Sequence, residues 1–263
     1  MEEIKVEVTE EVKEILSRGY VEGCLYFLPK VQLSREEYVS VNKILELSGG
    51  KWNRSKKGHI FESEEKAKTM LSVLEKDEIV DSKKTYQFFE TPSEIAEQLV
   101  ELAQIKYIDD MEDENSECYQ DVIEPSAGHG AICEKIDQSR CMFRCNEIDP
   151  EKCKVLEEKG YPVACIDFLT SDETADRFIM NPPFTRGQDV EHVLHAYSLL
   201  REGGRVVSIM AMGIKFNNQK KHKKLREIIE KHGEIIELPP NSFKESGTNV
   251  NAVIVVIDKL KIS

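Results

Sequence analysis

The sequence has no uninterrupted apolar stretch near the roughly 18–20 residues that a membrane-spanning helix requires. Its first residues, MEEIKVEVTEEVKEIL, are acidic and lack the basic and then apolar segments of a secretory signal. It also has no internal repeat and no long linker rich in proline, glycine or serine. Hydrophobic residues make up 40% and charged residues 32%, which excludes a disordered chain. We therefore expect a folded cytoplasmic protein without membrane contacts.

None of the seven cysteines belongs to a CxxC pair. Their odd number and scattered spacing argue against the disulfide framework of a small secreted domain. Cys141, Cys145 and Cys153 cluster loosely, but no histidine stands at ligand spacing beside them. We expect free, largely buried thiols and no metal site.

The net charge of −13 argues against a nucleic-acid partner, unless positive charge is gathered locally. An acidic run occupies 109–117, within one expected surface loop. Two basic clusters stand elsewhere, and each is either an ordinary solvated face or a phosphate-binding surface. Their members are Lys51, Arg54, Lys56 and Lys57 in the first cluster, and Lys215, Lys220, Lys221, Lys223, Lys224 and Arg226 in the second.

The hydrophobic pattern predicts two domains, with a small α+β domain at 1–82 and an α/β domain at 83–263. In the first, we expect helices at 10–17, 34–47 and 63–74, a strand at 25–31, and a turn and strand at 51–61. In the second, strands and helices alternate, which predicts a doubly wound, mostly parallel seven-stranded sheet. Its strands are expected at 121–124, 141–147, 163–167, 177–180, 205–212, 235–238 and 252–258, and its helices at 91–102, 131–137, 150–159, 190–200 and 219–232.

A small-residue loop, EPSAGHG at 124–130, stands between an expected strand and the next helix. Its glycines allow the backbone to approach a ligand closely, with a helix N-terminus facing it. The loop matches neither the phosphate-binding GxxxxGK[ST] pattern nor GxGxxG. It is either a cofactor-binding loop or a turn that merely needs small residues.

Acidic residues follow the second and third strands, where ligands of doubly wound sheets bind. Glu147 can accept hydrogen bonds from both hydroxyls of a ribose, and Asp149 is the alternative acid. Ile148 offers an apolar surface to an adenine. Asp167 can accept from an adenine amino group, and Phe168 can cover the ring.

The most specific motif is Asn181-Pro182-Pro183-Phe184, directly after the fourth strand. Two prolines hold the backbone extended and rigid. The Asn181 side-chain oxygen and the Pro182 carbonyl can then both accept from a substrate NH₂ group. An amino group conjugated to a base is a poor nucleophile, and two acceptors favour the pyramidal nitrogen that attacks. Phe184 would stack on the base.

In this order the motifs resemble the amino-methylating DNA methyltransferases, specifically the N6-adenine branch. Phe89-Glu90-Thr91-Pro92 is similar to the upstream segment of that family, and Leu238 to Phe243 to its late motif; together the motifs span about 86–258. The resemblance implies a class I, Rossmann-like fold, S-adenosylmethionine as cofactor, no metal and no covalent intermediate. It assigns the methionine end of the cofactor to Thr91 and the loop residues Glu124, Pro125, Ala127, Gly128 and Gly130, and the nucleoside end to Glu147, Ile148, Asp167 and Phe168.

The same resemblance assigns the target base to Asn181, Pro182, Pro183 and Phe184, with Phe243 as a second wall. A base within a duplex cannot reach such a site, so the DNA target must be flipped out or single-stranded. We expect Lys220, Lys221 and Lys223 on the helix beside the site to contact phosphates. The segment from Lys51 to His59 is a candidate for base readout, and the GGKWxR…HxF pattern at 49–61 resembles leader domains of phage- and plasmid-borne methyltransferases.

Two other functions are consistent with the same residues. Methylation of another amino group, such as a protein glutamine amide or an RNA base, uses the same chemistry. A module that binds nucleic acid without catalysis is the second alternative, although the intact Asn181 and Glu147 argue against it.

Overall fold

The computed structural model describes residues 4–81, 89–106, 120–244 and 250–261, and the chain divides into two compact units, 1–85 and 86–263. The sequence predicts a boundary after residue 82, which lies among residues outside the described ranges. No helix in the described part of the chain is long and apolar enough to cross a membrane.

The N-terminal unit contains two antiparallel sheets, packed with helices around a core of its own. Ser34 caps the longest helix: its hydroxyl accepts from the Glu37 N–H while the Glu37 carboxylate accepts from the Ser34 N–H. The sheets have the orders β1-β6 and β2-β3-β5-β4. The elements are β1 (Lys5–Glu7), α1 (Glu10–Ser17), β2 (Tyr20–Glu22), β3 (Leu25–Phe27), α2 (Arg35–Leu47), β4 (Lys51–Asn53), β5 (Gly58–Ile60), α3 (Glu64–Thr69), η1 (Met70–Glu75) and β6 (Glu78–Val80).

The C-terminal unit is a seven-stranded sheet with the order β12-β13-β11-β10-β7-β8-β9, in which only β13 runs against its neighbours. This confirms the expected doubly wound, mostly parallel α/β fold. The elements are α5 (Ser93–Ala103), β7 (Asp121–Glu124), η3 (Cys133–Lys135), β8 (Met142–Glu147), α6 (Pro150–Glu158), β9 (Val163–Cys165), η4 (Phe168–Thr170), β10 (Ala175–Met180), η5 (Thr185–Gly187), α7 (Gln188–Leu199), β11 (Leu200–Ala211), η6 (Met212–Lys215), α8 (Lys220–His232), β12 (Gly233–Glu237) and β13 (Ala252–Asp258).

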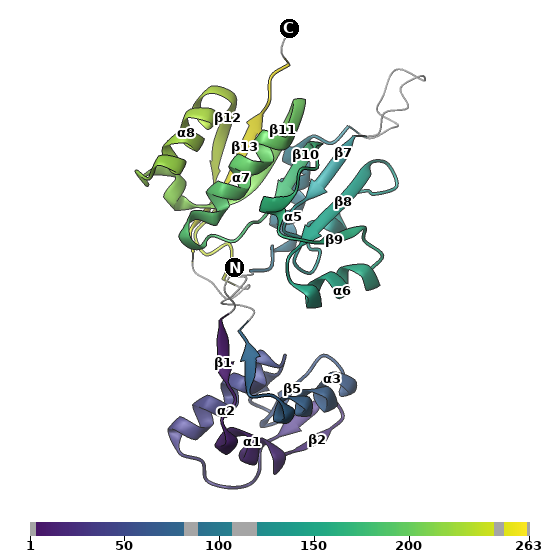
Figure 1. Cartoon of the computed structure of the whole chain (residues 1–263), viewed down its shortest axis with the longest axis vertical. Helices are drawn as coiled ribbons and strands as arrows, with labels where there is room; N and C mark the ends of the chain where they lie inside the picture. Colours follow the sequence, from purple (N-terminus) through teal and green to yellow (C-terminus); the bar gives the residue numbers. More distant parts are fainter. Residues whose placement is uncertain (1–3, 82–88, 107–119, 245–249, 262–263) are drawn as a thin grey trace. The chain divides into compact units, whose positions relative to one another are not determined.

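Helices cover both faces of this sheet. Side chains alternate between the two faces along each strand, so neighbouring residues of one strand pack on opposite sides of the sheet. Val206 and Val207, adjacent on β11, belong to two different hydrophobic clusters. Helix α5 contributes to the cluster of Val207, whereas α7 and α8 contribute to that of Val206 (Figure 1). Because both faces are packed with apolar side chains, the polar groups of the sheet gather at the ends of its strands.

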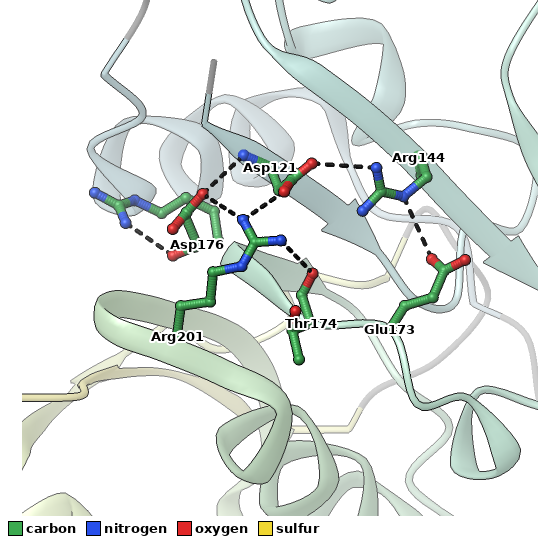
Figure 2. A network of polar contacts seen from close by, with 7 residues as sticks. Asp121, Arg144, Glu173, Thr174, Asp176 and Arg201 are labelled. Carbon is green, nitrogen blue, oxygen red and sulfur yellow. Dashed lines mark hydrogen bonds and ion pairs between the residues drawn. The ribbon is translucent and has the colours of Figure 1, made fainter. Parts of the chain in front are cut away.

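An ionic network joins the amino ends of neighbouring strands (Figure 2). Asp121, at the start of β7, accepts from Arg144 at 3.1 Å and also pairs with Arg201. Arg201 bridges on to Asp176 at 3.1 Å, and Arg144 reaches Glu173 at 3.3 Å. These charges hold the first residues of β7, β10 and β11 together at the amino edge of the sheet.

The buried Arg177 side chain binds backbone carbonyl oxygens at the C-terminal end of α5. Arg177 donates to the carbonyl oxygens of Ala103 at 2.7 Å, Asp176 at 2.8 Å and Gln104 at 3.1 Å. Two of these carbonyls lie at the helix C-terminus, where intrahelical partners run out and the dipole favours a cation. Arg205 adds a bond to the Leu102 carbonyl at 2.9 Å.

Two local expectations are corrected by the structure, which also contains three short strands that the sequence does not predict. No α-helix forms over 131–137: only the short η3 follows the loop, because the turn around Asp137 and Ser139 ends it after one turn. The short strands β1, β2 and β6 are not apparent from the sequence. Cys153 and Cys165 form a disulfide instead of remaining free, because α6 packs beside β9 and brings their Cα atoms to 5.9 Å.

Arg177→Met should lower the free energy of unfolding of the C-terminal unit by about 2–4 kcal/mol, because it leaves three carbonyls without their donor. Urea unfolding followed by circular dichroism measures this. Lys224→Met, at an exposed position of α8, removes the same charge and should change stability by less than about 0.5 kcal/mol. Equal effects of the two substitutions would contradict the assigned role of Arg177.

Candidate functional site

Four adjacent parallel strands, β10, β7, β8 and β9, end at one edge of the sheet. Four of the motifs found in the sequence lie at these ends. Glu124 ends β7, Glu147 ends β8, Asp167 follows β9 and Asn181 follows β10. The fold therefore brings to one edge the residues that the sequence places far apart.

Two hydrogen bonds hold the small-residue loop at 124–130 against the end of β8. Ala127 N–H donates to the Asn146 carbonyl at 3.0 Å, and Gly128 N–H donates to the Glu147 carboxylate at 2.7 Å. Gly128 and Gly130 have φ values of 58° and 88°, in the left-handed region. These hydrogen bonds fix the path of the loop beside β8.

Gly130 is also required by space. A Cβ on this residue would lie 3.0 Å from the Tyr161 ring and 3.1 Å from the Leu156 side chain. Both contacts are closer than packed carbon atoms normally approach. The structure therefore accounts for glycine at this position through both conformation and packing.

The Glu147 carboxylate is almost fully engaged by backbone donors. One oxygen accepts from Gly128, and the other accepts from the N–H groups of Ile148 and Asp149, both at 2.8 Å. A carboxylate offers about four lone-pair sites, so roughly one remains for a ligand. Asp149 is committed as well, because it caps α6 through Glu151 N–H at 3.0 Å and pairs with Lys152 at 3.3 Å.

Glu124 is the most deeply buried acidic residue of the site, with 1% of its surface exposed. Its carboxyl group accepts from the Cys133 thiol at 2.7 Å. Burial raises the pKa of Glu124 to about 8, and the nearby Glu147 also raises this pKa. Near neutral pH, Glu124 is therefore mostly protonated in this structure.

The Asn181 side chain is held by two acceptors from the segment before α5. Its Nδ2 donates to the Phe89 carbonyl oxygen at 3.0 Å and to Thr91 Oγ1 at 3.1 Å. The Phe89 carbonyl can only accept, so the amide nitrogen must face it and the orientation of the amide is fixed. The Asn181 oxygen is left as an acceptor at the end of β10.

The rest of the NPPF motif is partly or fully buried. Pro182 is buried, Pro183 and Phe184 are half-buried, and Phe184 packs against one of the two core clusters.

Lys221, at the start of α8, donates to the Arg186 carbonyl oxygen at 2.7 Å. The basic helix therefore begins beside the segment that follows the motif.

The lysines of this helix differ in their surroundings. Lys221 is also paired with Glu191 at 2.8 Å. Lys220 and Lys223 are exposed and have no ion-pair partner in the ranges that the structure describes. Two of the three lysines expected to contact phosphates are thus free to bind an anion.

Two expected aromatic contacts lie elsewhere than the sequence suggests. Phe168 is 3% exposed, with its ring centroid 5.9 Å from that of Phe178 and 5.0 Å from that of His195. Phe243 is 1% exposed within the core. In this structure neither ring is available to cover a ligand, so their assigned roles stay predictions. After β9, the apolar side chain that is exposed is Ile166, not Phe168.

The sequence analysis does not identify two features of this edge. Phe216, between η6 and α8, is 68% exposed, the most of any large apolar side chain within the described residues. The side-chain oxygen of Asn146 is buried without a donor in the described part of the chain. An aromatic residue beside a lysine-rich helix is a detectable pattern, but burial of Asn146 follows only from the fold.

The C-terminal part of the chain matches a known family. Residues 166–263, which include the NPPF motif and β10 to β13, match the family model described as N-6 DNA Methylase. This confirms, over these residues, the resemblance to N6-adenine DNA methyltransferases. Comparison with curated proteins finds no match to this chain.

Solved structures share the fold. The methyltransferase subunit of a type I restriction-modification system from Streptococcus thermophilus is 14% identical, with a TM-score of 0.52 over 75% of this chain and 53% of that one. The M protein of the type I restriction enzyme EcoKI is 15% identical, with a TM-score of 0.52 over 88% of this chain and 56% of that one. This chain spans about half the length of these proteins.

Gly130→Ala should destabilise the C-terminal unit by about 2–4 kcal/mol, through left-handed strain plus overpacking against Tyr161 and Leu156. Gly160→Ala is the matched control, because Gly160 has a φ of 83° but nothing within 4 Å of an added Cβ. Its cost should be about 1–2 kcal/mol. Urea unfolding followed by circular dichroism compares the two, and a cost at Gly160 as large as that at Gly130 would refute the packing argument.

Glu124→Gln should flatten the fall in stability with rising pH. Because burial raises the folded pKa of Glu124 to about 8, the folded chain binds more protons than the unfolded chain between about pH 4.5 and 8. The stability associated with protonated Glu124 is therefore present below this window and is lost as pH rises through 8. Urea unfolding at pH 5, 7 and 9 measures it, and an identical decline in both proteins would exclude a titrating Glu124.

Proposed function

We propose that this chain transfers a methyl group from S-adenosylmethionine to the N6 amino group of adenine in DNA. The observation that carries the proposal is the fixed Asn181 amide, whose nitrogen is occupied by Phe89 and Thr91 and whose oxygen is left to accept. An acceptor held in one orientation is what an arylamine nucleophile requires. The family match over 166–263 supports adenine in DNA as the target.

The residues at the carboxyl edge fit the proposed cofactor. Glu147 has about one free lone-pair site for a ribose hydroxyl, which is fewer than the two bonds expected from the sequence. The protonated Glu124 and the unpaired Asn146 oxygen are polar groups that lack full compensation in the chain itself. A ligand with a cationic amino acid end and hydroxyl donors compensates groups of this kind. When bound, S-adenosylmethionine supplies an electrophilic methyl group on a sulfonium.

The chain's own residues then perform two tasks. The Asn181 oxygen and the Pro182 carbonyl accept from the two hydrogens of the amino group, which frees the nitrogen lone pair. The stiff Pro182-Pro183 segment holds these acceptors in place. After methyl transfer the nitrogen is acidic enough to lose its proton to water, so a strongly basic side chain is not needed.

The target adenine has to leave the base stack to reach the end of β10. Phe184 is the aromatic residue that would stack on the base. Lys220 and Lys223 supply positive charge on the helix that begins beside this segment, where phosphates can be bound. We propose DNA that is flipped or single-stranded at the target as the substrate.

Asn181→Ala should reduce methyl transfer by at least about 100-fold, because one of two acceptors for the amino group is removed. Cofactor affinity, measured by calorimetry, should change by less than about three-fold. Thr91→Val removes one of the two bonds that orient the amide and should have a smaller effect, about ten-fold.

Methylation is detected by modification-sensitive sequencing of genomic DNA from a host that expresses each variant. The wild-type chain should give N6-methyladenine within a defined sequence, and Asn181→Ala should give none. Full activity of Asn181→Ala would overturn the role of this residue. Absence of methylated DNA with the wild-type chain, despite cofactor binding, would overturn DNA as the substrate.

A further inference from the structure

The four-stranded sheet of the N-terminal unit has an inner face that belongs to the helix-packed core and an outer face whose residues do not belong to it. Tyr26, on the inner face, belongs to the core that this unit builds with its helices. Residues on the other face lie opposite one another across the strands: Tyr20 opposite Phe27, and Leu25 opposite Ile60. None of these four belongs to the hydrophobic cluster of the unit within the described residues. This outer face therefore carries a cluster of apolar side chains, with the exposed Glu22 opposite Leu25 at its β2 edge.

An aromatic pair lies on this outer face. The rings of Tyr20 and Phe27 are stacked, with centroids 5.1 Å apart and an angle of 21° between their planes. The Phe27 ring also covers Gly58, where a Cβ would lie 3.1 Å from it. Phe27 is thus fixed from both sides, whereas Tyr20 is 49% exposed on the edge strand β2. A flat, partly exposed ring on a rigid support is suited to stacking with a planar ligand.

Positive charge is concentrated at the end of the same sheet. Lys51, on the outer face opposite Ile60, and Arg54, Lys56 and Lys57, in the turn between β4 and β5, are all exposed. None of them has an acidic partner in the part of the chain that the structure describes. The turn is held by Asn53, whose side-chain oxygen accepts from Lys56 N–H at 3.0 Å. The chain has a net charge of −13, so four unpaired cations on one hairpin form a local positive region on a mostly acidic protein.

We propose that the outer face of this sheet, with the β4–β5 turn, is a binding platform for single-stranded DNA. An unpaired base stacks on Tyr20, and the backbone phosphates contact the turn. Tyr20 and the cations lie at opposite edges of one sheet, so a single strand that crosses the outer face meets an aromatic ring for a base and positive charge for its phosphates. An apolar protein partner would leave the cations unpaired. The inference rests on the proposed function only in naming DNA, since the platform lies entirely within the N-terminal unit.

The test is binding of the full-length chain to a fluorescein-labelled, 16-nucleotide single-stranded DNA of mixed sequence, measured by anisotropy. Tyr20→Ala should weaken binding about 5- to 50-fold. Tyr38→Ala, at an exposed tyrosine of α2, is the matched control and should have no effect. Tyr20→Phe keeps the ring and should retain binding, which separates stacking from misfolding.

The charge requirement is tested in parallel. Arg54→Glu should weaken binding and reduce the slope of log K against log[salt] by about 0.7 for each phosphate that the variant no longer binds. Lys76→Glu, at an exposed lysine beside the other sheet, is the matched control and should change neither. Trp52 on β4 is the only tryptophan, so its fluorescence reports whether DNA reaches this unit.

The outcomes are distinct. Loss of binding with Tyr20→Ala and Arg54→Glu, but not with their controls, supports the platform even if no methyl transfer is detected. Equal binding by all variants, with methyl transfer intact, overturns the platform and leaves the proposed function standing. Tighter binding of duplex DNA than of the single strand overturns base stacking. A dimer that Tyr20→Ala dissociates without affecting DNA binding would overturn the platform and assign the face to a second copy of the chain.

Discussion

The parallel register of β10, β7, β8 and β9 is the constraint on which the candidate site depends. Parallel strands end at the same edge, so residues that follow them in sequence must meet in space. The register is held at the opposite edge, where Asp121 and Asp176 share Arg201 and their strands cannot slide past one another. A one-residue slip would also reverse the side chains that face the two core clusters. Charge at the amino edge thus stabilises the arrangement of hydrogen-bonding groups at the carboxyl edge.

At the carboxyl edge, functional groups are oriented by backbone atoms instead of by other charges. Glu147 is fixed by three N–H donors, and Asn181 by the Phe89 carbonyl together with Thr91. Backbone groups cannot rotate away as side chains can, so this arrangement is already organised before any ligand binds. It also has a cost, since most of the accepting capacity of Glu147 is used internally.

Sequence reasoning succeeded where a local rule decides the structure. The Ser34 capping box defined α2, and the alternation of strands and helices after residue 86 predicted the sheet. It does not reach what tertiary packing decides, such as which aromatic side chains are buried. The same residue type stands at Phe168, Phe184 and Phe243, yet only Phe184 is left partly exposed. The pairing of Cys153 with Cys165 depends on how α6 packs beside β9, which no spacing rule encodes.

The net charge of the chain is likewise a poor guide to what it binds. It is a sum over the whole surface, whereas a ligand contacts only one part of that surface. A ligand within a Debye length, about 10 Å at 0.1 M salt, responds to the nearest charges. In the β4–β5 turn these are Lys56 and Lys57 without acidic partners among the described residues, whereas on α3 Lys66 and Lys68 are neutralised by Glu62 and Glu64. The paired lysines contribute little field outside the protein, while the unpaired ones retain theirs. Which cations are paired therefore determines where an acidic chain can bind a polyanion. Pairs spaced i,i+4 on a helix can be read from the sequence, whereas pairs between distant segments, such as Arg201 with Asp176, require the fold.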